Sequence, residues 1–476
     1  MPTFTPEQLQ QWTGGRWTRV PQGGASGFAI DTRQIGAGEV FVALRSEKRD
    51  GHNFVPTAEA AGAYAAIVEQ PVAPSSLPQL VVESPLRAFQ ALATAHRKSF
   101  AGPIVGITGS CGKTSTKEIL SLILGREKTL RTSGNLNNYL GVPLTLLRLD
   151  ASTHTAGVIE AGINMPQEMD LLGSMIEPEV GIVTLIGAAH LEKLGSLAGV
   201  AAEKVKLLHH VRQGGMAVFP ASCLDYPVFA EMPEGIRPVI VGSVHPDKLP
   251  AHAWHASWSF AGNPASSQGG LIHMQIPAIG VEARIEIPAM SSGMRGNAAL
   301  CIATALIRGL DARTISTRIS LWQPGDDRGR IVRHQGQVFY IDCYNANPTS
   351  MQDALEYFRD LFARLPKLYV IGGMRELGAN TSDLHRRLGL SLHLRKPDRA
   401  VLVGSEGVYI RQGMLENGCS ASSITLVPSA EEATPFLQDF EGAILLKGSR
   451  YYRLETLVPT TAEAGAGLAK QGHQVC

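Results

Sequence analysis

The chain has 476 residues, enough for about three domains of ordinary size. Its 44% hydrophobic and 18% charged residues are typical of a globular protein, and its formal net charge of +1 excludes a global positive field for nucleic acid or anionic membranes. No apolar run reaches the roughly 20 residues of a membrane span. Because a signal peptide is not evident and none of the six cysteines forms a C-x-x-C pair, we expect a cytoplasmic protein without a disulfide framework.

Residues 1–98 are predicted to form a small α/β domain. Thr5, Pro6 and Gln8 have the spacing of a helix start with a capping box. Strand-like runs follow at 28–31, 40–43 and 65–68, and a helix is expected over 86–100. Polar turns at 31–33 and 50–52 separate the strands. Arg33 could hold a phosphate there, but from these residues alone a solvated turn is the preferred interpretation.

A glycine-rich turn at residues 105–116, VGITGSCGKTST, is the central motif of the chain. It lies between a predicted buried strand at 103–108 and a predicted helix at 113–124. Such a turn brings backbone N–H groups to a phosphate, Lys113 to the outer phosphates and Thr114 to Mg²⁺. The strict G-x-x-x-x-G-K-[ST] pattern is missed by one residue, because position 107 is isoleucine. A chance glycine-rich turn is the alternative.

Polar residues follow the next predicted strands of this central domain, residues 99–321. A strand over 156–160 ends in Glu160, and a strand over 181–186 precedes His190. Because parallel strands end at the same edge of a sheet, both side chains could complete the shell of a nucleotide-bound divalent ion. Mg²⁺ prefers oxygen ligands, however, so a hydrogen-bonded structural His190 is the alternative. The asparagine-rich loop at 132–138 is either a turn or a substrate loop.

The rest of the central domain carries weaker signals. The helix predicted over 196–211 contains Glu203, Lys204 and Lys206, and such a charged group usually forms a solvated face. Residues 250–290 suggest antiparallel strands. A further helix is expected over 295–309, with Asn297 at its start.

The third domain, residues 322–476, alternates strands with helices, the pattern of a doubly wound sheet. The expected strands are 338–344, 368–373, 400–404, 423–427 and 443–448. The expected helices are 350–364, 382–394, 406–416 and 429–439. No G-x-G-x-x-G follows the first strand, so an independent dinucleotide site is not expected. The small-residue-rich tail from about residue 459 is expected to be disordered.

Several motifs together resemble the Mur ligase family of peptidoglycan synthesis. The family's phosphate loop has the form TG-[ST]-x-GKT, which TGSCGKT at 108–114 matches. GNLNN at 134–138, GVPL at 141–144 and YNANP at 344–348 are further matches. Shorter matches lie at 31–33, 50–52, 189–192, 329–330, 376–378 and 447–450. The resemblance spans all three domains, and the combination of GNLNN with YNANP makes it specific.

The resemblance implies an ATP- and Mg²⁺-dependent amide ligase that joins D-alanyl-D-alanine to UDP-N-acetylmuramoyl-tripeptide through an acyl phosphate. It implies an α/β protein of three domains: a small UDP-binding domain, a central P-loop domain with a mostly parallel sheet, and a C-terminal Rossmann-like domain that binds the dipeptide. Neither nucleic acid nor a membrane is an expected partner, and a monomer is expected.

The resemblance also assigns roles to individual residues. The implied catalytic residues are Lys113, Glu160, His190 and Lys204. The implied ATP-binding residues are Thr108, Gly109, Ser110, Cys111, Gly112, Lys113, Thr114, Ser115, Asn297, Arg330 and Asp342. The implied substrate-binding residues are Thr32, Arg33, Asp50, His52, Asn135, Asn137, Asn138, Asn345 and Asn347. The implied metal ligands are Thr114, Glu160, His190 and, if it is carbamylated, Lys204.

At four positions the chain departs from the family pattern. Ile341 and Gly373 stand where acidic residues are usual, Lys206 where one is frequent, and Gly293 where a histidine is expected. Three alternatives therefore remain: another Mur-type amide ligase, a P-loop NTPase without ligase activity, and a binding protein derived from the fold. A folylpolyglutamate synthase-like ligase fits less well, because it lacks a UDP-binding domain.

Overall fold

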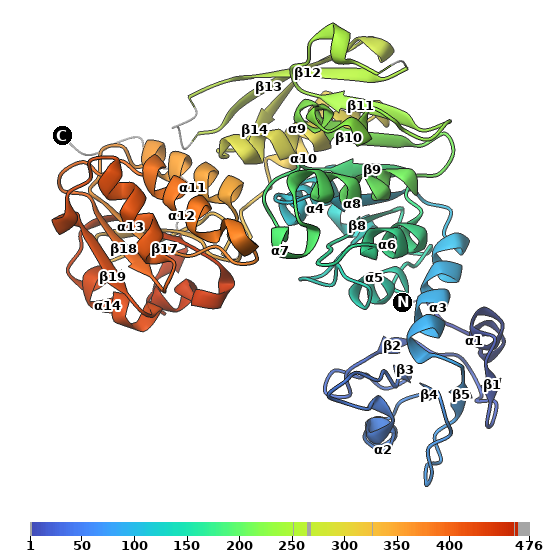
Figure 1. Cartoon of the computed structure of the whole chain (residues 1–476). Helices are drawn as coiled ribbons and strands as arrows, with labels where there is room; N and C mark the ends of the chain where they lie inside the picture. Colours follow the sequence, from blue (N-terminus) through green and yellow to red (C-terminus); the bar gives the residue numbers. More distant parts are fainter. Residues whose placement is uncertain (1, 251, 264–267, 326, 461, 465–476) are drawn as a thin grey trace.

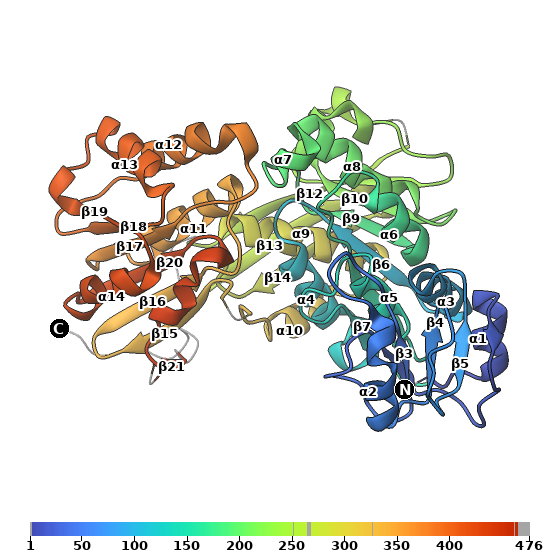
Figure 2. The same cartoon turned by 60° about the horizontal axis from the view of Figure 1, so that its bottom comes forward.

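The structure is a computed structural model that describes residues 2–250, 252–263, 268–325, 327–460 and 462–464. Three sheets follow one another along the chain. Figures 1 and 2 show the central unit between the first (blue) and the third (orange to red). The three sheets confirm the predicted α/β class, whereas the exact domain boundaries stay a prediction. In the described residues, no helix is long and apolar enough to cross a membrane.

The first sheet has the strand order β1-β5-β4-β3-β2, and all its neighbours are parallel except β1 and β5. Its strands are β1 Arg16–Trp17, β2 Gly27–Ala29, β3 Glu39–Val42, β4 Ala65–Val68 and β5 Gln79–Val81. Its helices are α1 Pro6–Thr13, α2 Val55–Ala60 and α3 Pro85–Ser99. The capping box predicted at α1 is present, with Thr5 as the N-cap.

The central sheet has the order β14-β13-β12-β11-β10-β9-β6-β8-β7. Its parallel part comprises β6 Ile104–Thr108, β7 Thr129–Arg131, β8 Ala156–Glu160, β9 Val180–Val183, β10 Met216–Pro220, β11 Arg237–Val241 and β12 Trp254–Ala261. The strands β13 Gly270–Ile276 and β14 Val281–Ile287 continue β12 antiparallel, as predicted for residues 250–290.

Helices cover both faces of the central sheet because its buried strands present apolar side chains to each face. The helices α4 Lys113–Leu124, α9 Ser292–Ile307 and α10 Ala312–Ile319 share one apolar core with it. The helices α5 Gly141–Leu146, α6 Glu168–Ile176 and α8 Leu197–His209 pack into other cores, and the short α7 Leu191–Leu194 precedes α8.

The third sheet has the order β19-β18-β17-β20-β16-β15-β21. Its strands are β15 Arg330–His334, β16 Gln337–Asp342, β17 Lys367–Gly372, β18 Arg399–Val403, β19 Ile424–Val427, β20 Gly442–Lys447 and β21 Glu463–Ala464. The helices α11 Pro348–Leu361, α12 Thr381–Ser391 and α13 Gly407–Glu416 pack on one face, and α14 Ala430–Gln438 packs on the other. This arrangement confirms the predicted doubly wound sheet.

The C-terminal tail departs in part from its expected disorder. Glu463–Ala464 pair with β15, whose antiparallel edge offers free backbone groups to a passing segment. Residue 461 and residues 465–476 lie outside the described residues.

Candidate active site

The glycine-rich turn joins β6 to α4. Gly112 is the N-cap of α4 with a left-handed φ of +81°, and a Cβ added to it would lie 2.5 Å from the Asn297 side chain. A Cβ at Gly109 would meet the hydroxyl of Thr184. Both glycines are therefore required for the close approach of the turn to its neighbours. The turn leaves the first N–H groups of α4 free for an anion, and the Lys113 ammonium donates to the carbonyl of Gly109 at 2.8 Å.

Glu160, at the end of β8, is the carboxylate on which this site converges. The Thr114 hydroxyl donates to its Oε2 at 2.9 Å, and the Asn137 amide donates to its Oε1 at 2.8 Å. The backbone N–H of Glu160 donates to the Thr132 hydroxyl at 2.9 Å. With 2% of its surface exposed, Glu160 is a buried carboxylate fixed by oxygen and nitrogen donors. Asn137 is thus not merely a turn residue of the asparagine-rich loop.

Two lysines lie near one another at the turn: Lys204 is buried and Lys113 is half-buried. Burial lowers the pKa of Lys113, and the charge of Glu160 opposes this shift. Burial also lowers the pKa of Lys204 well below its usual range, and the charge of Lys113 adds to the effect. The solvated face expected for the charged group on α8 is wrong for Glu203 and Lys204, which are 5% and 1% exposed. Glu203 is instead turned inward, where it accepts the backbone N–H of Met169 at 3.0 Å.

His190 connects the central and third units. Its backbone is left-handed, with φ of 56°, and its Nδ1 bonds to the carboxylate of Glu376. This hydrogen bond is the main reason that the pKa of Glu376 is lowered. Among the residues that the structure describes, no group of three or more His, Cys, Asp or Glu side chains is placed to hold a metal ion. Metal ligation by His190 therefore stays a prediction.

The third unit brings polar side chains to the same turn. Asp342, the last residue of β16, pairs with the buried Lys447 at 2.8 Å, and the Lys447 ammonium donates to the carbonyl of Asn345 at 2.9 Å. Asn347 caps α11 and donates from its amide to the carbonyl of Ser110 at 3.1 Å. The YNANP motif thus forms part of the contact between the two units.

Asp353 makes a second contact between these units. From α11 it accepts the Ser291 hydroxyl at 2.6 Å and the Gly293 N–H at 2.8 Å, at the start of α9. A Cβ at Gly293 would lie 2.9 Å from Asp353, so the missing side chain at this position makes room for the carboxylate. Burial raises the pKa of Asp353. No pattern in the sequence pointed to Asp353, because its partners are about sixty residues away.

A cavity of about 360 Å³ unites most of these groups. Its lining includes the predicted residues Ser110, Cys111, Gly112, Lys113, Thr114, Ser115, Asn135, Asn137, Asn138, Glu160, His190, Asn297, Asp342, Asn345 and Asn347. Thr108, Gly109, Lys204 and Arg330 are not among its lining residues. Thr108 is buried in β6, and Arg330 begins β15. The lining also contains Arg328, which sequence reasoning missed and which stacks on the ring of Tyr344 at 3.9 Å.

The polar turns of the first unit do not reach this cavity. Thr32 and Arg33 line a separate cavity of about 620 Å³, together with Arg45, Arg49 and, from the central unit, Tyr139. In the structure Arg33 pairs with Asp31 at 2.6 Å, and this hydrogen bond holds the pKa of Asp31 at about 2.

Asp50 and His52 have structural contacts. Asp50 accepts the His52 N–H at 3.0 Å and pairs with Arg45 at 2.9 Å, while the His52 ring accepts the Glu69 N–H at 2.9 Å. Neither side chain lines the cavity of the first unit, although Gly51 between them does. Asn138 likewise accepts two N–H groups at the start of α5.

Comparison with protein families gives matches over most of the chain. Residues 25–97 match the Mur ligase family catalytic domain, residues 107–305 the Mur ligase middle domain, and residues 327–450 the Mur ligase glutamate ligase domain. Each of these three ranges covers strands of a different sheet.

Individual proteins are similar over nearly the whole length. The UDP-N-acetylmuramoyl-tripeptide–D-alanyl-D-alanine ligase of Escherichia coli (strain K12) is 32% identical over 448 residues, which cover 91% of this chain and 93% of that protein. The enzyme of that name from Bacillus subtilis (strain 168) is 28% identical over 92% of this chain and 93% of its own.

Solved structures agree with these matches. A crystal structure of MurF from Acinetobacter baumannii superposes with a TM-score of 0.82 and 30% identity, covering 96% of this chain and 98% of its own. MurF from Thermotoga maritima in complex with ADP gives a TM-score of 0.74 and 25% identity, covering 90% and 96%. The chain belongs to the Mur ligase family.

Proposed function

We propose that this chain joins D-alanyl-D-alanine to UDP-N-acetylmuramoyl-tripeptide with consumption of ATP, in the synthesis of the peptidoglycan precursor. The observation that carries the proposal is the convergence on Glu160: Thr114 of the phosphate loop and Asn137 of the GNLNN loop contact its two carboxylate oxygens. A nucleotide-binding element and a ligase-specific loop thus meet at one buried charge. This connection favours a ligase over a general P-loop NTPase.

The residues present fit a magnesium nucleotide. The Thr114 hydroxyl and the Glu160 carboxylate provide the oxygen ligands that Mg²⁺ prefers. Gly109 and Gly112 let the turn lie against Thr184 and Asn297, where a Cβ would collide with these side chains. Bound there, Mg²⁺ would neutralise part of the phosphate charge. Lys113 would place its ammonium on the outer phosphates, and Asn297 would lie beside the loop on the adenine side.

The proposed reaction has two steps. The terminal carboxylate of the tripeptide attacks the γ-phosphorus of ATP, ADP leaves, and an acyl phosphate forms. The amine of D-alanyl-D-alanine then attacks the acyl carbon, the amide C–N bond forms as the C–O bond to phosphate breaks, and the amine loses a proton. Fixed positive charge from Lys113 would stabilise the transferring group in a site closed to water.

Other parts of the chain have roles in this proposal. The cavity at Thr32 and Arg33 would bind the UDP end of the substrate, since Arg33, Arg45 and Arg49 there suit a diphosphate. The buried Lys204 would be carbamylated, because the lowered pKa favours the neutral amine that attacks CO₂ and loses a proton. We further propose that the protein is cytoplasmic and monomeric. Light scattering after size-exclusion chromatography would test the monomeric state.

The test is phosphate release from Mg-ATP with UDP-N-acetylmuramoyl-tripeptide, with and without D-alanyl-D-alanine. We expect release that requires both substrates, yields the UDP-muramoyl-pentapeptide, and disappears in Lys113→Ala. Lys128→Ala, an exposed lysine shortly after α4, is the matched control and should behave as wild type. Release without either substrate would instead support an NTPase, and turnover only with another amino acid a different Mur-type ligase.

A further inference from the structure

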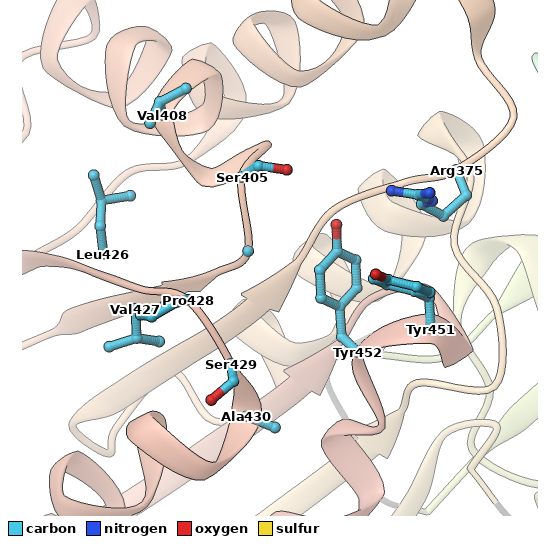
Figure 3. Close-up of a pocket in the computed structure, with 11 residues that line it drawn as sticks. Arg375, Ser405, Val408, Leu426, Val427, Pro428, Ser429, Ala430, Tyr451 and Tyr452 are labelled. Carbon is cyan, nitrogen blue, oxygen red and sulfur yellow. The ribbon is translucent and has the colours of Figure 1, made fainter.

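One buried cation of the central unit has no role in the proposed function so far. The third unit has a cavity of about 690 Å³, in which Arg375 and Tyr451 stand on one side and Leu426 on the other (Figure 3). The family resemblance already predicts the dipeptide in this unit, so this cavity belongs to the proposed function. Lys117 of α4 is not among the lining residues of this cavity or of the two described above.

Lys117 is buried although its side chain ends in an ammonium group. It is 2% exposed, whereas lysines are almost never fully buried unless they are paired. The ammonium pairs with Glu118 at 3.1 Å, but the Glu118 side chain is 28% exposed and also pairs with Arg126 and Arg131. Because Glu118 retains two cationic partners without Lys117, the burial of Lys117 requires a further explanation.

The second partner of Lys117 lies in another element. Its ammonium donates to the carbonyl of Thr132 at 2.8 Å. Thr132 directly follows β7 and begins the asparagine-rich loop, residues 132–138, and its own N–H still pairs with Val158 of β8 at 3.2 Å. A hydrogen bond from an ionised donor is roughly twice as strong as one between neutral groups. Lys117 thus fixes the point at which the chain leaves the sheet to form the loop.

Thr132 connects Lys117 to the carboxylate of the candidate active site. Its hydroxyl accepts the backbone N–H of Glu160 at 2.9 Å, while its carbonyl is held by Lys117. At the other end of the loop, the Asn137 amide donates to the Glu160 carboxylate at 2.8 Å, and the Asn137 carbonyl accepts the Gly162 N–H at 2.8 Å. The loop is therefore attached to the end of β8 at both of its ends.

The two ends of the loop are fixed in different ways. The second end is closely packed, because a Cβ at Gly162 would lie 2.8 Å from the Asn137 side chain. Near the first end, a Cβ at Gly134 would meet nothing within 4 Å, and the hydroxyl of residue 133 accepts an exposed hydrogen bond from Arg148 at 3.3 Å. The buried hydrogen bond from Lys117 is therefore the main anchor of the first end.

We propose that Lys117 is a positioning residue for the ligase reaction: by holding Thr132, it keeps the asparagine-rich loop against Glu160. This assignment rests on the proposed function. Lys117 contacts no substrate in it and acts through Thr132 on the orientation of Glu160 and Asn137.

The kinetic test replaces Lys117 with methionine, which keeps an unbranched apolar chain but cannot donate to Thr132. We expect kcat for pentapeptide formation to fall about 10- to 100-fold, as loss of a hydrogen bond from a charged group would give. The KM for ATP should stay close to that of wild type, because the phosphate loop is unchanged. Lys117→Gln retains a shorter, neutral donor and should lie between the two, which keeps the position testable if Lys117→Met does not fold.

The connecting residue can be tested separately. Thr132→Val removes the hydroxyl that accepts the Glu160 N–H and keeps the shape of the side chain, so it should lower kcat in the same way as Lys117→Met. Thr132→Ser keeps this acceptor and should behave as wild type. If both Thr132 variants behave as wild type, Lys117 does not act through this hydroxyl, and the proposal is wrong.

Lys367→Met is the matched control. Lys367 is also a buried lysine, 5% exposed, that donates to the carbonyl of Leu365 at 2.9 Å and pairs with Asp398. It begins β17 in the third unit and does not line the cavity at the phosphate loop. Lys367→Met should lower the midpoint of thermal unfolding, as Lys117→Met does, but leave kcat of the folded enzyme unchanged. Equal losses of kcat in both variants, or wild-type kcat in Lys117→Met, would overturn the proposal.

Hydrogen exchange followed by mass spectrometry tests the positioning without any turnover. We expect peptides that contain residues 132–138 and the Glu160 and Gly162 amides to exchange faster in Lys117→Met than in wild type, and peptides of the third unit to be unchanged. Lys367→Met should leave the peptides of the loop unchanged. If wild type forms no pentapeptide, the proposed function fails by itself, and this measurement still decides the role of Lys117. Unchanged exchange around the loop in Lys117→Met would reject it.

Discussion

Glu160 is held by neutral donors, and its charge is therefore its distinctive property. Thr114 and Asn137 each donate one hydrogen bond to it, and neither compensates a full negative charge in a buried position. The nearby Lys113 interacts with this charge, but no cation is bonded to the carboxylate by these two donors. A buried carboxylate held by neutral donors is costly, so a protein retains one where it acts on a cation. Glu160 fits that role beside the phosphate loop.

Replacing Glu160 with glutamine should therefore separate function from stability. We expect Glu160→Gln to reduce kcat by about 100- to 1,000-fold, the range found when one electrostatic contact to a transition state is lost. The free energy of unfolding should stay within about 1 kcal/mol, because a buried charge is removed and the shape is kept. Steady-state kinetics and urea unfolding measure the two effects. An active Glu160→Gln would mean that the carboxylate only orders the loop.

The turn between β6 and α4 depends on one backbone conformation. Gly112→Ala places a side chain at φ of +81° and its Cβ 2.5 Å from Asn297. We therefore expect the free energy of unfolding to fall by about 1–3 kcal/mol and the affinity for an ATP analogue to decrease. Gly296→Ala on the facing helix α9 is the control, since a Cβ there meets nothing within 4 Å. Thermal unfolding and nucleotide titration measure both variants. Wild-type affinity in Gly112→Ala would show that the turn adapts.

The elements around this turn were predictable to different degrees. Residues 156–160 and 113–124 are a strand and a helix as predicted, because an apolar run and a glycine turn are local signals. The inward position of Lys204 was not predictable, since burial depends on packing and not on the helix pattern. Edge strands such as β15 and β21 were missed because their pairing partners, not their composition, define them.

The apolar residue at position 341 is explained by its packing in the third sheet. Ile341 is fully buried in the core between the third sheet and α14, while its neighbour Asp342 lies at the cavity. The alternation of side chains along β16 thus separates the two positions. The substitution at 341 therefore leaves the carboxylate at the cavity in place.

The contact between α11 and α9 should depend on pH. Burial raises the pKa of Asp353 above its ordinary 3.8, so the folded protein holds this proton more tightly than the unfolded chain. The charged carboxylate therefore opposes folding at neutral pH, and this cost disappears as the pH falls through the raised pKa towards 3.8. Asp353→Asn does not titrate. Its stability advantage over wild type should therefore shrink on acidification.

Urea unfolding of both proteins at several pH values between 7 and 4 measures this difference. Other groups titrate equally in the two proteins and cancel in the comparison. Asp311→Asn is the control, because this carboxylate caps the exposed start of α10 and its pKa is lowered. The stability difference between this variant and wild type should therefore change with pH in the opposite direction. If the difference in unfolding free energy between wild type and Asp353→Asn does not change with pH, a cost of ionising the buried Asp353 is excluded.

The three units of the molecule are joined in two different ways. The first and central units share one apolar core, in which Phe4, Leu9 and Phe89 belong to the same cluster as Val142 and Leu172. The central and third units meet through polar contacts, namely Asn347 with Ser110, Asp353 with the start of α9, and Glu376 with His190. Apolar cores move as rigid bodies, whereas polar contacts can be exchanged for water at little cost.

This asymmetry predicts which unit moves during the reaction. Substrate exchange requires the 360 Å³ cavity at the phosphate loop to open, and the third unit supplies Asp342, Asn345 and Lys447 to its wall. We therefore expect an ATP analogue with UDP-N-acetylmuramoyl-tripeptide to change the distance between dyes on the central and third units. A dye pair across the first and central units should report no change, because opening there would expose a shared apolar core. A change only in the dye pair across the first and central units would contradict this assignment, and so would an unchanged radius of gyration in X-ray scattering on addition of both ligands.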